Sequence, residues 1–172
     1  MRGRFPILYV AEADASDAIL SSGVLACLVE AMPQASFTVV GSPKSAPLFA
    51  DTPRLDRLIV LERDSRLDWL GLWNKVRETR WGLVVDMRGT TLSSKLKRQK
   101  RAVRGAWEAG VHAVEQAARV LQLEQVPAPK LFLSETTRAA ADALIPVEDV
   151  PLLAMGPGAD WMGKVWPSER YA

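Results

Sequence analysis

The amino-acid sequence predicts an α/β fold in which a mostly parallel sheet has helices on both of its faces. Runs of about five apolar residues, bounded by chain-breaking residues, alternate with longer segments of helical period, which is typical of β-α-β units. The clearest run is Leu83-Val84-Val85. It is apolar without alternation, as expected of a parallel strand that is covered on both faces.

The first third of the chain predicts three strands and one helix. Ile7–Ala11 is the first apolar run. The apolar residues at positions 24, 25, 28, 29 and 32 then share one face of a helix, which Pro33 ends. Phe37–Val40 and Arg57–Leu61 are the second and third strands.

The next segments continue the alternation. An apolar stripe predicts a helix over Leu67–Thr79, and Gly82–Asp86 is the fourth strand. Ala113–Leu123 is helical, Leu131–Leu133 is a short strand, and Ser134 caps a helix that runs to about Leu144. We therefore expect about five or six strands in the sheet.

The carboxyl-terminal segment predicts the start of a second domain. Pro151–Met155 forms another apolar strand, and a new helix begins at Pro167. This arrangement divides the chain into a first domain over residues 1–145, a linker over 146–150 and the truncated start of another α/β domain over 151–172.

Composition excludes several classes of protein. The chain has 172 residues, 48% of them apolar and 24% charged, which excludes a disordered or collagen-like protein. A net charge of +2 excludes a polycation that binds nucleic acid as a whole. One cysteine, Cys27, and one histidine, His112, cannot form a disulfide framework or a Cys/His zinc site, and they suit a reducing compartment.

No membrane-crossing or targeting segment is predicted. The longest apolar-rich stretch, Ala18–Val29, is shorter than the roughly 20 residues that a bilayer requires. The apolar run at Phe5–Ala11 is short for a signal peptide.

The loop after the first strand contains carboxylates and no glycine. Without glycine, the backbone of residues 12–17 cannot approach a pyrophosphate as a dinucleotide-binding loop does, which opposes a nucleotide-dependent oxidoreductase. Glu12, Asp14 and Asp17 lie where open α/β sheets bind ligands. Asp17 either stabilises the start of the helix or serves as a general base.

The end of the fourth strand is followed by a basic run. Asp86 either caps a helix near Thr91–Leu96 or lies in the cleft. No acidic residue occurs from 87 to 107, so the segment has a strongly positive local field. This basic run either holds phosphates or a negatively charged membrane face, or is simply part of the solvated surface. The run lacks the interleaved aromatic residues of a nucleic-acid groove. Its cations are Arg88, Lys95, Lys97, Arg98, Lys100, Arg101 and Arg104.

Other candidate residues have simpler interpretations. His112 lies at a helix start and is interpreted as a cap or a packing residue. Trp69 and Trp73, at helical spacing, are interpreted as core residues. The glycine-rich loop over Gly156–Pro167 predicts an anion cradle, but Val165 excludes a Walker A motif.

The ordered set of motifs resembles the family 9 glycosyltransferases, the lipopolysaccharide heptosyltransferases and their relatives. The resemblance is carried by residues 7–10, 16–22, 83–89, 156–159 and 164–170, and it covers the amino-terminal half of such an enzyme. It implies a B-type fold with two Rossmann-like domains. The first domain receives an anionic lipopolysaccharide-core acceptor, and the second holds an ADP-activated heptose. Transfer inverts the anomeric centre without metal or cofactor.

The resemblance also implies site residues. The family's catalytic base falls on Asp17, although Ser16 replaces the usual preceding glycine. Donor binding falls on Gly158, Ala159 and Lys164. The expected acceptor-binding cations are Arg88, Lys97, Arg98, Lys100 and Arg101.

The resemblance leads to expectations about location and activity. It implies a cytoplasmic protein in peripheral contact with the inner membrane. Because the 172-residue chain lacks most of a donor domain, we expect it to be inactive alone. The alternative is a non-catalytic Rossmann-like module that binds an anionic ligand or a protein partner.

Overall fold

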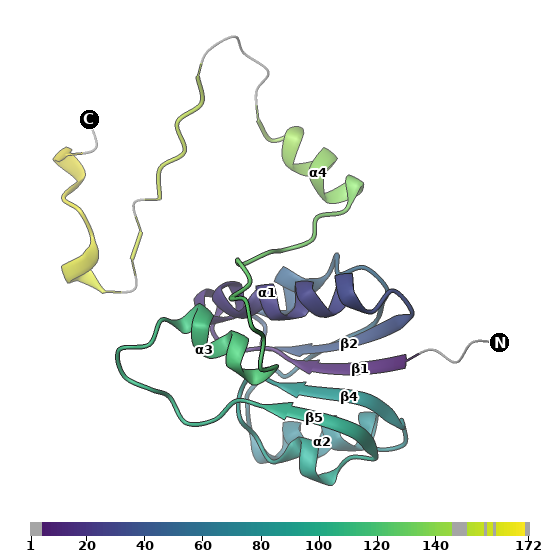
Figure 1. Cartoon of the computed structure of the whole chain (residues 1–172). Coiled ribbons are helices and arrows are strands. Elements are labelled where there is room, and N and C mark those ends of the chain that lie inside the picture. The colour runs from purple at the N-terminus through teal and green to yellow at the C-terminus, as the bar shows by residue number, and fades with distance from the viewer. Residues whose placement is uncertain (1–4, 146–150, 157, 160, 171–172) are drawn as a thin grey trace. The chain divides into compact units, whose positions relative to one another are not determined.

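Five parallel strands form one sheet with the order β3-β2-β1-β4-β5 (Figure 1). The structure is a computed structural model that describes residues 5–145, 151–156, 158–159 and 161–170. The all-parallel sheet confirms the predicted α/β, Rossmann-like fold. The strands are β1 (Phe5–Val10), β2 (Ala35–Gly41), β3 (Leu55–Val60), β4 (Trp81–Asp86) and β5 (Arg98–Val103).

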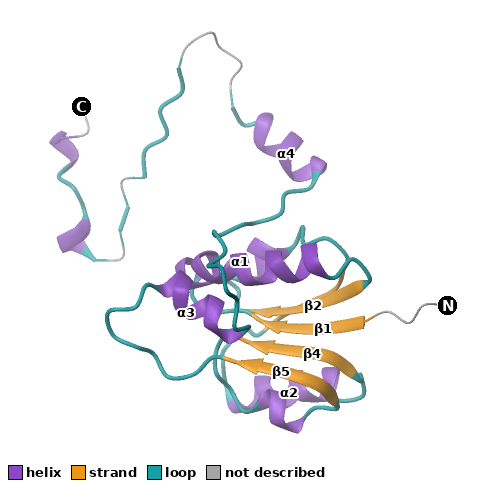
Figure 2. Cartoon of the chain, in the orientation of Figure 1, coloured by secondary structure: helices purple, strands orange, loops and turns teal. Residues whose placement is uncertain are grey.

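Helices cover both faces of the sheet (Figure 2). Helices α1 and α3 pack together on one face, and α2 packs on the other. The α-helices are α1 (Ala15–Ala31), α2 (Arg66–Val76), α3 (Ala113–Val120) and α4 (Glu135–Asp142). Short 3₁₀ helices are η1 (Ala46–Phe49), η2 (Leu92–Lys95), η3 (Met162–Lys164) and η4 (Ser168–Arg170).

Side-chain alternation along β1 divides the core into two layers. Ile7 and Tyr9 point to the face that α1 and α3 cover, whereas Leu8 and Val10 point to the face under α2. All four side chains are fully buried. A central strand that is buried on both faces has to be apolar throughout, which is why its sequence predicts it so well.

Local capping explains where the helices begin. The Asp14 carboxylate accepts a hydrogen bond from the Ser16 amide at 2.9 Å and is the N-cap of α1. Ser65 and Asp68 form a capping box at the start of α2. At Gly23, a Cβ atom would lie 2.5 Å from the Ala128 carbonyl oxygen, so this glycine lets the later chain pass close over α1.

The sequence predicts only a basic run where strand β5 lies, so this strand is a finding of the structure. It pairs with β4 alone and therefore forms an edge of the sheet. Charged residues are usual on edge strands because they oppose pairing with other chains. The helix considered near Thr91–Leu96 is the single 3₁₀ turn η2.

The strand predicted at Leu131–Leu133 is wrong. The segment makes no ladder with the sheet; instead its side chains Leu131 and Phe132 pack against the core cluster beside α1. The Lys130 amide donates to Ser22 Oγ at 2.9 Å. Packing against the core therefore accounts for the apolar residues at 131–133. A strand would in addition need a neighbouring strand to pair with, and among the residues that the structure describes this segment has none.

Residues from Thr136 onward form a separate unit of the chain. The strand predicted over Pro151–Met155 is wrong, since these residues are exposed and none is in a ladder. A strand requires a partner backbone, and among the described residues none pairs with it. The helix expected at Pro167 is the 3₁₀ turn η4, and the predicted linker over 146–150 lies outside the described residues.

In the described parts of the chain, no helix is both long and apolar enough to cross a bilayer.

Candidate functional site at the carboxyl edge of the sheet

The strand order reverses between β1 and β4, and this switch point positions the candidate site. The chain moves outward from β1 to β2 and β3 on one side, and from β4 to β5 on the other. Ligands of open α/β sheets bind beyond the carboxyl ends of the strands at such a point. The loops after Val10, Asp86 and Val103 lie at this edge of the sheet and line the candidate site.

Asp17 lies exposed in the first turn of α1, directly after the loop that follows β1. The N-cap position is taken by Asp14, so Asp17 is not the capping residue. Asp17 shares the lining of a small cavity with Glu12, Arg104 and Trp107. Its carboxylate is thus available to a bound group at the switch point.

Glu12 and Arg104 form a partly buried ion pair beside Asp17. Arg104 Nη1 lies 2.5 Å from Glu12 Oε1, although the two residues are 92 positions apart in sequence. Burial raises the pKa of Glu12, Arg104 opposes this shift, and the nearby Asp17 carboxylate adds to it. Glu12 is therefore buried and ion-paired with Arg104, whereas Asp17 is exposed.

Asp86 organises the loop after β4. Its side chain is fully buried and accepts hydrogen bonds from the Arg88 amide at 3.0 Å and from the Thr90 amide and hydroxyl at 2.9 and 2.6 Å. Gly89 has φ of +68°, and a Cβ there would lie 3.0 Å from the Arg104 carbonyl oxygen. Asp86 thus holds the loop in place through hydrogen bonds from the protein interior, and its buried carboxylate is not open to a ligand.

Arg88 is the best-placed cation of the expected acceptor set. Its Nε donates to the Ala11 carbonyl at 2.7 Å, which ties the loops after β1 and β4 together. Nη1 lies 3.5 Å from Asp64 Oδ1, and only 7% of the side chain is exposed. Among the described residues, Nη1 and Nη2 have no hydrogen-bond acceptor. Burial lowers the pKa of this guanidinium, and Asp64 opposes that shift.

The structure distributes the other expected acceptor cations along the sheet edge. Lys97 and Arg98 lie at the amino end of β5, whereas Asp17 lies at the carboxyl edge. Five steps of about 3.3 Å separate the ends of this strand by roughly 17 Å. Lys97 Nζ lies 3.9 Å from Glu78, and Arg98 donates to the Leu96 carbonyl at 3.0 Å. Lys100 and Arg101 are exposed between the two ends.

A buried glutamine holds the loop that follows β5. Gln116 bonds both the amide and the carbonyl of Glu108, at 3.0 and 3.1 Å, and the Val111 carbonyl at 2.9 Å. The loop carries Trp107, whose ring is exposed next to Asp17. His112 is the N-cap of α3, with Nδ1 accepting from the Val114 amide, which confirms the capping interpretation.

The expected donor-binding residues lie in the second unit. Gly158, Ala159 and Lys164 are exposed, and the Lys164 amide donates to the Trp161 carbonyl at 2.9 Å within η3. Part of the predicted cradle, Pro157 and Asp160, is outside the described residues.

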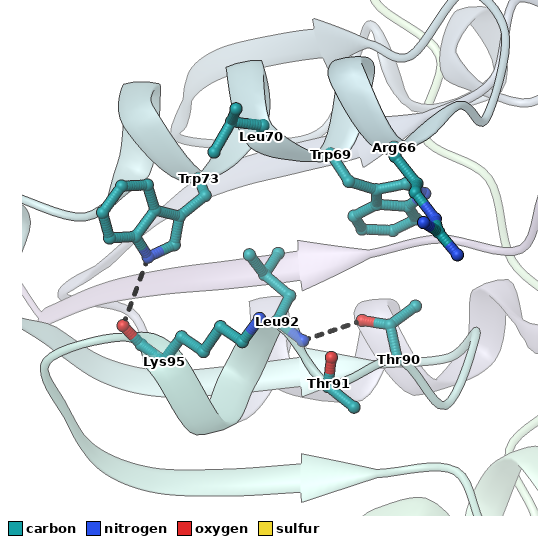
Figure 3. A pocket seen from close by; sticks show the side chains of 8 residues that line it. All are labelled: Arg66, Trp69, Leu70, Trp73, Thr90, Thr91, Leu92 and Lys95. Atoms are coloured by element: carbon teal, nitrogen blue, oxygen red, sulfur yellow. Dashed lines mark hydrogen bonds between the residues drawn. The ribbon is translucent and has the colours of Figure 1, made fainter.

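The sequence interpretation missed a groove beside α2. Trp69 and Trp73 pack against the core cluster under α2, as the core interpretation expects, but both are only half-buried and also line an open groove next to the loop after β4 (Figure 3). The Arg88 guanidinium lies 5.7 Å from the Trp69 ring centre, which connects the groove to the switch point. Leu70, which lies between the two tryptophans in sequence, is exposed; apolar residues at helical spacing do not by themselves distinguish such an open face from a buried one.

Within the described residues, no group of three or more His, Cys, Asp or Glu side chains is placed to hold a metal ion.

Comparison with known proteins places this architecture among the glycosyltransferase structures. No family model matches the sequence, and no curated protein matches it. A solved structure of a glycosyl transferase family 9 protein from Veillonella parvula superposes with a TM-score of 0.69 at 19% identity, covering 96% of this chain and 57% of the other. The Escherichia coli heptosyltransferase WaaC with ADP superposes with a TM-score of 0.65 at 15% identity, covering 96% of this chain and 62% of the other.

The chain thus spans about three fifths of the length of both neighbours. At such identities the likeness establishes the fold. The resemblance that the sequence motifs predicted is confirmed at this level: the chain shares its fold with a family 9 glycosyltransferase and with a heptosyltransferase.

Proposed function

We propose that this chain is the acceptor-binding part of a glycosyltransferase. The enzyme would move a heptose or a related sugar from an ADP-activated donor to an anionic lipopolysaccharide-core acceptor, with inversion. The observation that carries the proposal is the exposed Asp17 carboxylate at the switch point of a fold shared with two glycosyltransferase structures. One of those structures contains ADP, which supports a nucleotide-sugar donor.

In the proposed reaction, Asp17 is the general base. Its carboxylate takes the proton of the acceptor hydroxyl while the hydroxyl oxygen bonds to the anomeric carbon of the donor. The bond from that carbon to the diphosphate oxygen breaks at the same time, and ADP leaves with the electron pair. Attack from the face opposite the leaving group inverts the anomeric centre.

The acceptor anion is assigned to Arg88. Its two terminal guanidinium nitrogens are buried and have no hydrogen-bond acceptor among the described residues, although Nη1 is ion-paired with Asp64 at 3.5 Å; a carboxylate or phosphate that reaches them would accept a bidentate pair of hydrogen bonds. Since Nε is already held by the Ala11 carbonyl, the guanidinium is oriented before the ligand arrives. Lys97, Arg98, Lys100 and Arg101 extend the positive field along β5 and suit a contact with the anionic inner face of the cytoplasmic membrane.

The donor diphosphate is assigned to Lys164 with the backbone amides of Gly158 and Ala159. A charge-assisted hydrogen bond of about 1.5–3 kcal/mol predicts that Lys164→Ala weakens ADP-heptose binding by roughly 10- to 150-fold in the whole protein. Titration calorimetry measures this change. Lys130→Ala, a matched surface variant remote in sequence, should bind as the wild type does, and equal affinity for Lys164→Ala would remove the lysine from the donor site.

The decisive experiment replaces Asp17 by asparagine in the whole protein. The substitution keeps the size of the side chain but removes its basicity, so we expect kcat to fall by about 10²–10⁴-fold. Donor affinity and Tm should stay close to the wild-type values. Transfer of radiolabelled sugar from ADP-heptose to a lipopolysaccharide-core acceptor measures kcat.

Asp14→Ala is the matched control. Asp14 is the N-cap, so its loss should lower the free energy of unfolding by about 0.5–2 kcal/mol while kcat changes little. Turnover of Asp17→Asn close to that of the wild type would disprove the base assignment. If the wild-type protein transfers sugar from none of the donors tested, the chain is better described as a non-catalytic binding module.

A further inference from the structure

The groove beside α2 is lined by residues of α2 and of the segment after β4, and it has a volume of about 670 Å³. One wall is the stripe Arg66, Trp69, Leu70 and Trp73, at the i, i+3, i+4, i+7 spacing of one helix face. The other wall is the segment from Thr90 to Lys95 that follows β4. The size is within the range of small-molecule sites.

The lining of the groove is mainly apolar, with Thr90 and Thr91 as its uncharged polar residues. Figure 3 shows the two indoles at either end, with Leu70 and Leu92 between them. The indole N–H of Trp69 donates to Asp64 at 2.6 Å and that of Trp73 to the Lys95 carbonyl at 3.4 Å. Because both N–H groups have acceptors on the protein, the rings present carbon surface to a ligand. Leu70 is nevertheless 57% exposed.

The rim of the groove is cationic. Arg66 and Lys95 are exposed on opposite walls, and no carboxylate lines the groove. In the described part of the chain neither cation forms an ion pair with a carboxylate, and the nearby Asp64 already contacts Trp69 and Arg88. The groove therefore combines an apolar floor with two cations at its opening.

We propose that this groove binds the acyl chain of an anionic amphiphile, whose charged head lies against Arg66 and Lys95. An acyl chain matches the apolar walls, and an anionic head matches the rim charge. A second copy of the chain fits less well, because a two-fold contact through the groove would bring its like-charged rims together. The inference goes beyond sugar transfer, since it concerns residues on α2 and η2 and requires no donor.

The test uses dodecyl phosphate, kept below its micelle concentration, as the probe and the intrinsic tryptophan fluorescence of the chain as the readout. We expect a saturable change with dodecyl phosphate and none with inorganic phosphate. Decyl phosphate should bind roughly 15-fold more weakly, because each buried methylene contributes about fourfold in affinity.

Two leucines on the same helix provide a matched pair of variants. Leu70 lines the groove, whereas Leu67 is 79% exposed and does not line it. Leu70→Asp should weaken dodecyl phosphate at least 10-fold, and Leu67→Asp should bind it as the wild type does. Lys95→Gln should weaken it several-fold. Since both leucines are exposed, both aspartate variants should keep the wild-type Tm.

Equal binding by Leu70→Asp and Leu67→Asp, or affinity that does not depend on chain length, would overturn the proposal. A self-association that Leu70→Asp abolishes, seen by sedimentation, would also overturn it in favour of a second copy. Asp17→Asn should bind the probe normally, so a failure of the proposed catalysis is distinguishable from a failure of the groove proposal.

Discussion

Glu12 and Asp17 are two carboxylates five positions apart that the fold places in different environments. Glu12 is buried against Arg104, and Asp17 is exposed in the first turn of α1. Burial disfavours the ionised form of Glu12, whereas the Asp17 carboxylate is exposed to solvent. This difference is why we assign proton transfer to Asp17 and positioning of the loop after β5 to Glu12.

Glu12→Gln tests the environment of Glu12 by the pH dependence of stability. Because the pKa of Glu12 is raised in the folded state, the folded protein binds more protons than the unfolded protein at pH values above about 4.5. The free energy of unfolding of the wild type should therefore fall relative to that of Glu12→Gln as the pH rises through this window. Urea unfolding between pH 4 and 7 measures the difference. A wild-type advantage that grows with pH would show that the attraction of Arg104 outweighs burial.

At the scale of elements, β5 shows how a charge run can be structural. Lys100 and Arg101 are exposed on a strand that pairs with one neighbour only. Their charges protect the edge from further pairing and also provide a positive surface. Both roles are compatible, and only the second predicts binding to anionic surfaces.

Neutralising the four cations from Lys97 to Arg101 separates these roles. The variant Lys97→Gln/Arg98→Gln/Lys100→Gln/Arg101→Gln should bind acidic liposomes more weakly, by on the order of fivefold per charge near the surface. Added salt should weaken the wild type in the same direction. Liposome sedimentation measures the binding.

The control neutralises four cations elsewhere, Lys44, Arg57, Lys130 and Arg138, which changes the net charge equally. It should retain most of the binding. Unaltered binding in the β5 variant would leave only the interpretation as a solvated, protected edge.

At the scale of the whole molecule, the chain consists of two units with unequal cores. Every member of both apolar clusters lies between Phe5 and Phe132, on the first unit. Helix α4 has no buried residue. The free energy of unfolding of the first unit should therefore depend little on residues from Thr136 onward.

A chain shortened to residues 1–135 tests this independence. We expect its Tm to lie within about 4 °C of that of the whole chain, since a change of 1 kcal/mol corresponds to about that shift. Calorimetry measures both values. A decrease beyond 10 °C would mean that the second unit supports the sheet.

The sequence by itself determined the three inner strands β1, β2 and β4 and the edge strand β3. It also determined the helices α1 to α3 and the approximate start of α4. Those elements are specified by local patterns, such as the apolar run of β1 and the helical spacing of apolar residues in α1. It also predicted Asp17 and Arg88 at the carboxyl edge, because parallel strands necessarily end on the same side. The resemblance to family 9 glycosyltransferases rested on the ordered motifs at residues 7–10, 16–22, 83–89, 156–159 and 164–170.

Only the tertiary structure decided which segments pair and which surfaces stay open. Strand β5 exists because β4 offers it a backbone edge, whereas Pro151–Met155, with a more apolar sequence, finds no such edge among the described residues. The Glu12–Arg104 pair and the groove between α2 and η2 likewise join residues far apart in the chain. Such contacts depend on non-local backbone pairing and packing, and no local pattern of residues encodes them.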